Sequence, residues 1–144
     1  AAAQQWREDV RALAAACPNV VCKVGGIQMA VNGWGWEHRA VPIGSEELAE
    51  ACWPWYSHVI REFGCARCMF ESNFPVDKDT VSYRTLWNAF KRTAARAGLG
   101  AREKQLIFHD TAVRTYGLAA VGPRAAAAAP PCRATWPGWR APPP

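Results

Sequence analysis

The sequence lacks the short motifs that identify several large enzyme classes. It has no Gly-x-Ser-x-Gly nucleophile motif, no phosphate-binding loop and no dinucleotide-binding glycine fingerprint. It also has no secretory signal peptide and no apolar run long enough to span a membrane. We therefore expect a soluble protein with no membrane partner, in a reducing and cytoplasmic compartment.

A strong charge of one sign is missing as well. The formal net charge of the 144 residues is +5, and three of these charges come from the C-terminal tail, at Arg124, Arg133 and Arg140. The rest of the chain has no basic stripe with interleaved aromatic side chains. We therefore expect no nucleic-acid partner.

Clusters of metal ligands are absent too. The three histidines, His38, His58 and His109, are scattered along the chain. Cys65 and Cys68 form a Cys-x-x-Cys pair, but no second pair lies at the spacing of a zinc site. The pair also runs from a helix end into a strand, unlike a redox motif, which opens a helix. We predict no metal site from these residues alone.

Composition divides the chain into two parts. Residues 1–118 have the mixture of apolar and polar residues typical of one domain. The eight tryptophans in the chain predict either a substantial core or many ligand-facing rings. Residues 119–144 are rich in alanine and proline and are predicted to be disordered. The alternative for this tail is a docking peptide that contains Trp136 and Trp139. The chain does not begin with methionine, so we expect a fragment or a processed chain.

The first half of the domain begins with a helix followed by a strand. Residues 6–16 place apolar side chains at helical spacing, and residues 19–24 form an apolar, β-branched run. Gly25 and Gly26 end this predicted strand and allow its backbone to approach a neighbour or a ligand. This order is typical of one half of a parallel βαβ unit.

A second helix-to-strand unit follows. Residues 45–63 predict a helix capped by Ser45, in which Pro54 causes a kink or a break into two helices. Residues 68–74 predict a strand that is buried on both faces, and Pro75 ends it. The repetition of helix and strand predicts an α/β fold with two parallel strands.

Helices are predicted for the remaining part of the domain. Thr80 or Ser82 caps the first of them, and residues 101–108 predict the next. Asp110 is expected to cap a last short helix in which Tyr116 points inward.

Polar side chains follow the second strand. Glu71, Asn73 and Asp77 cluster where this strand ends, and Lys23 lies near the end of the first strand. Ligands collect at the carboxyl ends of parallel strands, and a Lys23 ammonium beside the Glu71 carboxylate would satisfy both charges. The alternative is an ordinary connecting loop with its polar side chains in water.

The long segment after the first strand is the second candidate. Residues 27–44 have little periodicity and contain Trp34, Trp36, His38 and Arg39. Their position predicts either an active-site loop or a surface loop anchored by the two tryptophans.

Three stretches in series resemble the C-terminal part of the amidohydrolase-related family, the metal-dependent TIM-barrel hydrolases. Pro-Asn-Val-Val-Cys-Lys-Val-Gly-Gly at 18–26 resembles the seventh barrel strand of the family. The run at 67–76, with Glu-Ser-Asn-Phe-Pro, resembles the eighth, and residues 107–118 resemble the closing helix. The resemblance covers residues 1–118. It implies the C-terminal fragment of a TIM (β/α)8 barrel, with two parallel strands, several helices and a disordered tail.

The resemblance also implies a reaction. In such enzymes a divalent metal such as zinc activates water to attack the carbonyl of an amide, lactone or related carboxylic compound. The family's strand-eight aspartate, a metal ligand and base, corresponds here to Asn73, and the His-x-His pair of the first strand is absent. We therefore expect no metal in this chain. The candidate site residues are Asn73 and Glu71 as catalytic groups, and Lys23, His38 and Arg39 as substrate-binding groups.

Two functions remain open at this point. The first is a hydrolase that acts on a small carboxylic or lactone-type substrate, with this chain inactive by itself. The alternative is a non-catalytic binding or interaction module built from the same fold. Either one is compatible with an oligomer.

Overall fold

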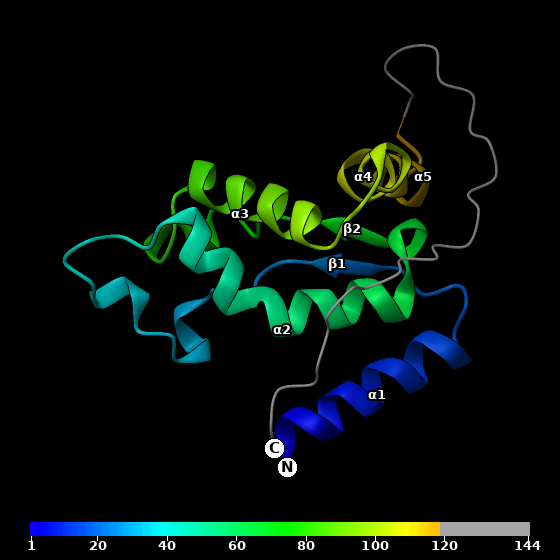
Figure 1. Cartoon of the computed structure of the whole chain (residues 1–144), viewed down its shortest axis with the longest axis horizontal. Helices are drawn as coiled ribbons and strands as arrows, with labels where there is room; N and C mark the ends of the chain where they lie inside the picture. The colour runs from blue at the N-terminus through cyan, green and yellow to red at the C-terminus, as the bar shows by residue number, and fades with distance from the viewer. Residues whose placement is uncertain (119–144) are drawn as a thin grey trace.

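The computed structural model describes residues 1–118. The tail predicted to be disordered, with Trp136 and Trp139, lies outside the described residues. The main elements are α1 (Ala2–Ala16), β1 (Cys22–Val24), α2 (Ser45–Phe63), β2 (Cys68–Phe70), α3 (Tyr83–Arg96), α4 (Ala101–Gln105) and α5 (Thr111–Tyr116). Short 3-10 helices span Ala30–Asn32, Trp36–His38, Cys65–Arg67 and Val76–Asp79, and a π-helix spans Leu106–Asp110. Figure 1 shows their arrangement.

The two strands pair in parallel, as the order of helices and strands predicted. The register places Cys22 opposite Cys68 and Val24 opposite Phe70. The Glu71 amide donates to the Val24 carbonyl oxygen at 3.2 Å, which continues the ladder by one bond. This confirms an α/β fold with two parallel strands and several helices. None of the helices within residues 1–118 is long and apolar enough to cross a lipid bilayer.

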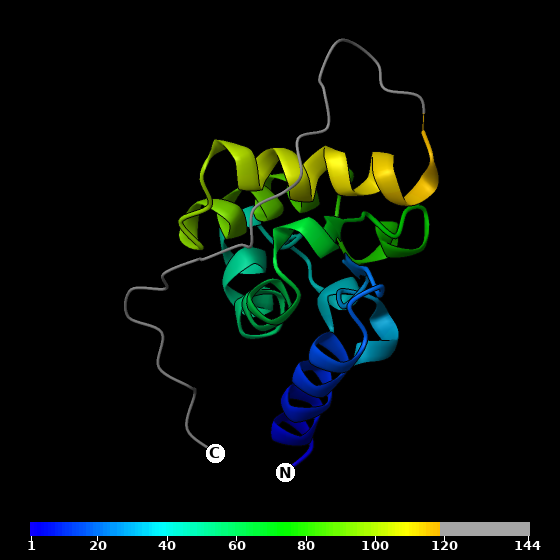
Figure 2. The same ribbon diagram turned by 90° about the vertical axis from the view of Figure 1, so that its right-hand side faces the viewer.

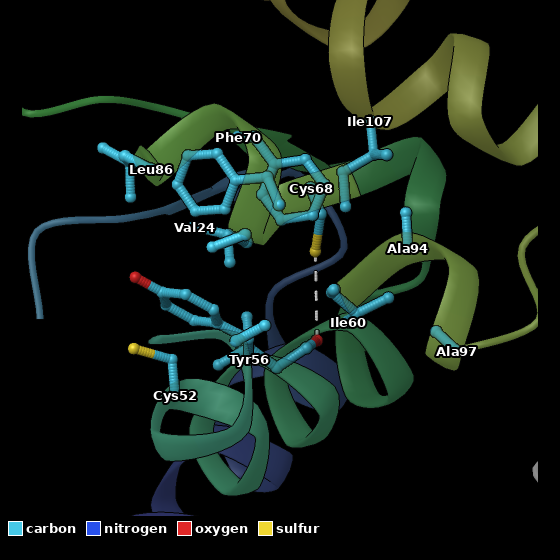
Figure 3. Packing of buried hydrophobic residues seen from close by; sticks show 14 of the residues in the cluster. Val24, Cys52, Tyr56, Ile60, Cys68, Phe70, Leu86, Ala94, Ala97 and Ile107 are labelled. Atoms are coloured by element: carbon cyan, nitrogen blue, oxygen red, sulfur yellow. Dashed lines mark hydrogen bonds between the residues drawn. The ribbon is translucent and has the colours of Figure 1, made fainter. Parts of the chain in front are cut away.

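The core lies between the strands and the helices α2 and α3. Phe70 and Phe90 stack with ring centroids 4.5 Å apart, and both are buried. Such a pair contributes roughly 0.5–1.5 kcal/mol beyond the area that it buries. Figure 3 shows Val24 and Phe70 of the strands facing Tyr56 and Ile60 of α2. In Figures 1 and 2, α1 lies on the opposite side of α2 from α4 and α5.

Helix α2 passes through Pro54 without a break. The predicted alternative of two helices is therefore wrong, because residues on both sides of Pro54 bury their apolar side chains in the same core. The Ser57 hydroxyl donates to the Trp53 carbonyl within this turn. Figure 1 shows that the helix changes direction near its middle, as expected where a proline removes a backbone bond. Ser45 does not cap the helix; Gly44 occupies the cap position.

The last helices differ from the prediction. Asp110 is not a cap, because helix α4 continues through the π-helix into α5 and Asp110 keeps helical dihedral angles. Its carboxylate instead accepts hydrogen bonds from Gln105, His109 and Arg102, and these lower the pKa of Asp110 to about 2. Tyr116 points outward and is 58% exposed. At α3 the cap is Ser82, which accepts from the Thr85 amide.

A buried histidine holds α1 against α2. His58 Nε2 lies 2.9 Å from the Arg7 carbonyl oxygen, and Arg61 Nη2 lies 2.7 Å from His58 Nδ1. Because a carbonyl only accepts, Nε2 carries the proton and Nδ1 accepts from the guanidinium. Arg67 adds a second tie, since it donates to the carbonyl oxygens of Ala14 and Cys17 at the end of α1.

Gly25 fixes the separation of the two strand ends. A Cβ atom added at Gly25 would lie 2.1 Å from the Glu71 carbonyl oxygen and 2.9 Å from its Cγ. The backbone of one strand end therefore presses directly on the other, and only glycine fits there. The sequence prediction of a close backbone approach at this glycine pair is confirmed.

We predict that Gly25→Ala destabilises the protein by about 3 kcal/mol or more, because a rigid backbone atom cannot yield to the new methyl group. The free energy of unfolding from urea denaturation measures this. Gly44→Ala is the matched control, since Gly44 has φ −82 and nothing lies within 4 Å of its added Cβ. It should cost less than about 1 kcal/mol. Equal losses in the two variants would contradict the close contact at Gly25.

We predict a second effect, on the pH dependence of stability. Burial lowers the pKa of His58, so the stability that neutral His58 contributes is present above the unfolded-state pKa of about 6.5 and lost as the pH falls below it. Urea unfolding at pH 7.5, 6 and 5 measures the decline. His58→Gln keeps a donor and an acceptor but does not titrate, so its decline should be shallower. His38→Gln, at an exposed histidine, is the control. An unchanged decline in His58→Gln would refute the assignment.

Candidate functional site

The candidate site lies where β1 and β2 end. In a parallel pair both carboxyl ends lie at the same edge of the sheet. The segments that follow the two strands, residues 25–44 and 71–82, therefore both begin at this edge. Figure 1 shows both segments on the left of the molecule. We call the group of Lys23, Glu71, Asn73 and Asp77 at this edge the strand-end cluster.

Lys23 and Glu71 form an ion pair across the two strands. Lys23 Nζ lies 3.9 Å from Glu71 Oε2, and the side chains are 55% and 24% exposed. An ion pair this exposed contributes less than about 1 kcal/mol to stability. Its main effect is to place an ammonium and a carboxylate side by side, in the arrangement expected from the sequence. They lie at the shared carboxyl ends of the two strands, which we call the mouth.

Asn73 occupies an unusual backbone conformation. Its φ of 53° makes it the only non-glycine residue in residues 1–118 with a positive φ. Its amide N–H donates to Glu71 Oε2 at 3.0 Å, and its side-chain Nδ2 donates to Asp77 Oδ1 at 2.7 Å. A left-handed asparagine costs about 1 kcal/mol or more and persists where surrounding contacts impose it. Here two carboxylates impose it.

Asp77 is the buried member of the cluster. Its residue exposure is 0%, and Oδ2 has no hydrogen-bond partner among the described residues. Burial raises the pKa of this carboxyl group, while the hydrogen bond from Asn73 acts in the opposite direction. The sequence pattern places Asp77 near the site without identifying it as a functional residue. The available signal was its position four residues after Asn73, within one turn.

A buried hydrogen bond between Tyr56 and Gln28 was not predicted from the sequence. The Tyr56 hydroxyl donates to Gln28 Oε1 at 2.8 Å, and Gln28 is fully buried. This bond ties the segment after β1 to α2. Burial raises the pKa of Tyr56, and it raises that of the Cys52 thiol to about 12. Cys52 is therefore no nucleophile at neutral pH.

The segment after β1 is anchored by its two tryptophans. Trp34 and Trp36 stack with ring centroids 4.5 Å apart, and Trp34 Nε1 donates to the Ile27 carbonyl. His38 is 83% exposed and lies 3.4 Å from Glu37, while Arg39 pairs with Glu47 at 2.8 Å. Within residues 1–118, no ion pair or hydrogen bond joins either residue to the strand-end cluster. Their role as substrate-binding groups stays a prediction.

The residues present do not form a metal site by themselves. No three His, Cys, Asp or Glu side chains of residues 1–118 are grouped so that they could hold a metal ion. Of the two carboxylates at the mouth, Glu71 is engaged by Lys23 and by the Asn73 amide, and Asp77 is buried. The Asn73 amide is an uncharged and weaker ligand than a carboxylate.

Comparison with known proteins gives the family. The amidohydrolase family model matches residues 1–118. The chain is 39% identical over 111 residues to the uncharacterized protein y4mH of Sinorhizobium fredii. The aligned region covers 77% of this chain and 32% of that protein. It is 32% identical over 114 residues to an L-fucono-1,5-lactonase of Burkholderia multivorans, with 79% and 36% covered. The chain thus spans about a third of the length of these relatives.

Solved structures agree with this match. A crystal structure of a Burkholderia multivorans amidohydrolase with bound zinc superposes with a TM-score of 0.67 at 29% identity, over 81% of this chain and 38% of that one. A second crystal form of that amidohydrolase, with bound HEPES, gives 0.67 at 30% identity over 82% and 38%. The two parallel strands and their helices thus correspond to part of an amidohydrolase TIM barrel. By its sequence and its fold, the chain belongs to the amidohydrolase family.

Proposed function

We propose that this chain forms the mouth of two neighbouring barrel strands in a hydrolase that acts on the carbonyl of a lactone, amide or related carboxylic compound. The observation that carries the proposal is the strand-end cluster, in which Lys23 and Glu71 pair at 3.9 Å beside Asn73. The similarity to a lactonase supports a small lactone or its acid as the ligand.

The geometry of the cluster supports a distinct role for each side chain. The Lys23 ammonium is the cation that would bind a carbonyl or carboxylate oxygen of the substrate and stabilise negative charge on it. The Glu71 carboxylate lies next to this cation and is the group that would accept a proton from attacking water. Asn73 would hydrogen-bond the substrate. These roles belong to the domain of residues 1–118, for which we also propose a cytoplasmic location.

For the metal of the family, the proposal concerns only which residues could be its ligands. A relative binds zinc in its crystal structure, but the strand-end cluster has no set of three ligands for such an ion. We place the ligands of any divalent metal outside residues 1–118 and assign no step to it. For the same reason we propose that the chain is inactive alone.

We predict that the purified chain does not hydrolyse L-fucono-1,5-lactone or simple esters above the uncatalysed rate, with or without added Zn²⁺ or Mn²⁺. The reason is that an activated water needs metal ligands that the described residues lack. Product formation measured by pH-stat or chromatography provides the test. Turnover that depends on the metal and disappears with a chelator would overturn this part of the proposal.

The second candidate is a non-catalytic binding or interaction module. The observation in its favour is the amide at position 73, whose Nδ2 already bonds to Asp77 inside the chain. A module of this kind would keep the fold without the reaction. A chimera separates the two candidates, because it adds barrel strands beyond the two that residues 1–118 form.

We predict that a chimera is active in which residues 1–118 replace the matching segment of the Burkholderia multivorans lactonase. Lys23→Met and Glu71→Gln in this chimera should each lower kcat/KM about tenfold or more, since a charged hydrogen bond contributes roughly 1.5–3 kcal/mol. Lys91→Met, at an exposed lysine of α3, is the control and should leave kcat/KM unchanged. A folded chimera without lactone hydrolysis would refute the hydrolase proposal and favour the module.

A further inference from the structure

We propose that Asp77 is a positioning residue that fixes the orientation of the Asn73 amide and thereby makes position 73 a hydrogen-bond acceptor at the mouth. The inference rests on the proposed function, which places Asn73 against the substrate. It adds a residue, a chemical consequence for the ligand, and a reason why this position carries an amide.

The orientation of the amide follows from the donor and acceptor rules. Asn73 Nδ2 lies 2.7 Å from Asp77 Oδ1. An ionised carboxylate only accepts hydrogen bonds, so the opposite orientation of the amide would place two oxygens in contact without a proton between them. The NH2 group therefore faces Asp77, and the Asn73 carbonyl oxygen, Oδ1, faces away from it.

Further contacts hold the amide in this orientation. The backbone of Asn73 is fixed by its N–H bond to Glu71 Oε2 and by the bond from the Asp77 amide to the Asn73 carbonyl at 3.3 Å. Gly26 packs against the amide, since a Cβ added there would lie 3.4 Å from Asn73 Nδ2. Asp77 itself is fully buried, so protein atoms shield its carboxylate from water.

The remaining acceptor indicates the chemistry of the ligand. No hydrogen bond formed within residues 1–118 occupies Asn73 Oδ1. The same mouth carries the Lys23 ammonium, which is 55% exposed and only donates. An acceptor and a cationic donor together fit a ligand with both a hydroxyl group and a carbonyl or carboxylate oxygen. A hydroxylated lactone, or the hydroxy acid that its hydrolysis releases, has this combination.

The contact also couples the two positions. A carboxylate at position 73 would meet the Asp77 carboxylate at hydrogen-bond distance, and two such groups cannot both be ionised at low cost. One amide and one carboxylate are tolerated in either order, because each order leaves one donor facing one acceptor. A change at position 73 alone is therefore unfavourable, and a paired exchange is not.

A double-mutant cycle on the 144-residue chain tests the coupling. The urea midpoint at pH 8 is measured for the unmodified chain, Asn73→Asp, Asp77→Asn and the double variant. We expect Asn73→Asp to lower the midpoint and the double variant to recover at least half of that loss. A double variant that shows the summed loss of the two single variants would overturn the inference. Asn19→Asp, at an exposed asparagine, controls for adding one negative charge.

A spectroscopic measurement separates positioning from a purely structural role. The chain has four asparagines and four glutamines, so its side-chain amides are few enough to resolve in a ¹⁵N-labelled sample. The Asn73 pair is the one that disappears in Asn73→Asp. We expect one of its protons to be shifted downfield and protected from solvent exchange, and to move upfield in Asp77→Asn. A proton that Asp77→Asn leaves unmoved would overturn the inference.

The wild-type spectrum decides the question even if Asp77→Asn does not fold. An Asn73 amide without a downfield, protected proton has no bond to a carboxylate, and the inference is then wrong. Both measurements use the chain without substrate. An inactive lactonase chimera would therefore refute the proposed function and leave the positioning role of Asp77 standing.

Discussion

The contact between Gly25 and the backbone of Glu71 is the constraint on which the site depends. A Cβ at Gly25 would lie 2.1 Å from the Glu71 carbonyl oxygen, so the two strand ends touch without a side chain between them. This closeness lets Lys23 of one strand reach Glu71 of the other. Glu71 in turn accepts the Asn73 amide, and Asn73 bonds to Asp77. These contacts follow one another from Gly25 at the end of the first strand to the buried carboxylate of Asp77.

The parts of this arrangement that the sequence predicted are those set by local rules. Parallel strands end at the same edge, so the proximity of Lys23 and Glu71 followed from two apolar runs and their helices. The clustering of Glu71, Asn73 and Asp77 followed from their spacing within seven residues of chain. Gly25 was identified as a point of close approach for the same reason, because a paired glycine ends a buried strand there.

The contacts that the sequence did not predict join distant residues or depend on packing. Gln28 and Tyr56 are 28 residues apart, and nothing in either segment identifies the other as its partner. Asp110 was expected to cap a helix, but the π-helix continues the helical backbone through it. Pro54 predicted either a kink or a break into two helices. The structure has one continuous helix, in which residues on both sides of Pro54 pack into the same core. The mouth role of His38 and Arg39 depends on contacts that residues 1–118 do not make.

An amide occupies position 73, just beyond the end of β2. Where the resemblance leads to an expected aspartate, the chain has Asn73, and a carboxylate lies four residues later in a buried position. We interpret the pair as one unit, in which Asp77 accepts the hydrogen bond and Asn73 presents an oriented, neutral oxygen. The negative charge at the mouth is then carried by Glu71, next to the Lys23 ammonium.

The most direct test of this account is a crystal structure of the lactonase chimera with a hydroxy-acid product bound. The account predicts that Lys23 Nζ and Asn73 Oδ1 both lie within hydrogen-bond distance of the product, at about 3.2 Å or less. It also predicts that Asn73 Nδ2 still faces Asp77 in that complex. A product bound in the barrel without contact to Lys23 or Asn73 would contradict the claim that the strand-end cluster is the substrate-binding edge of the site.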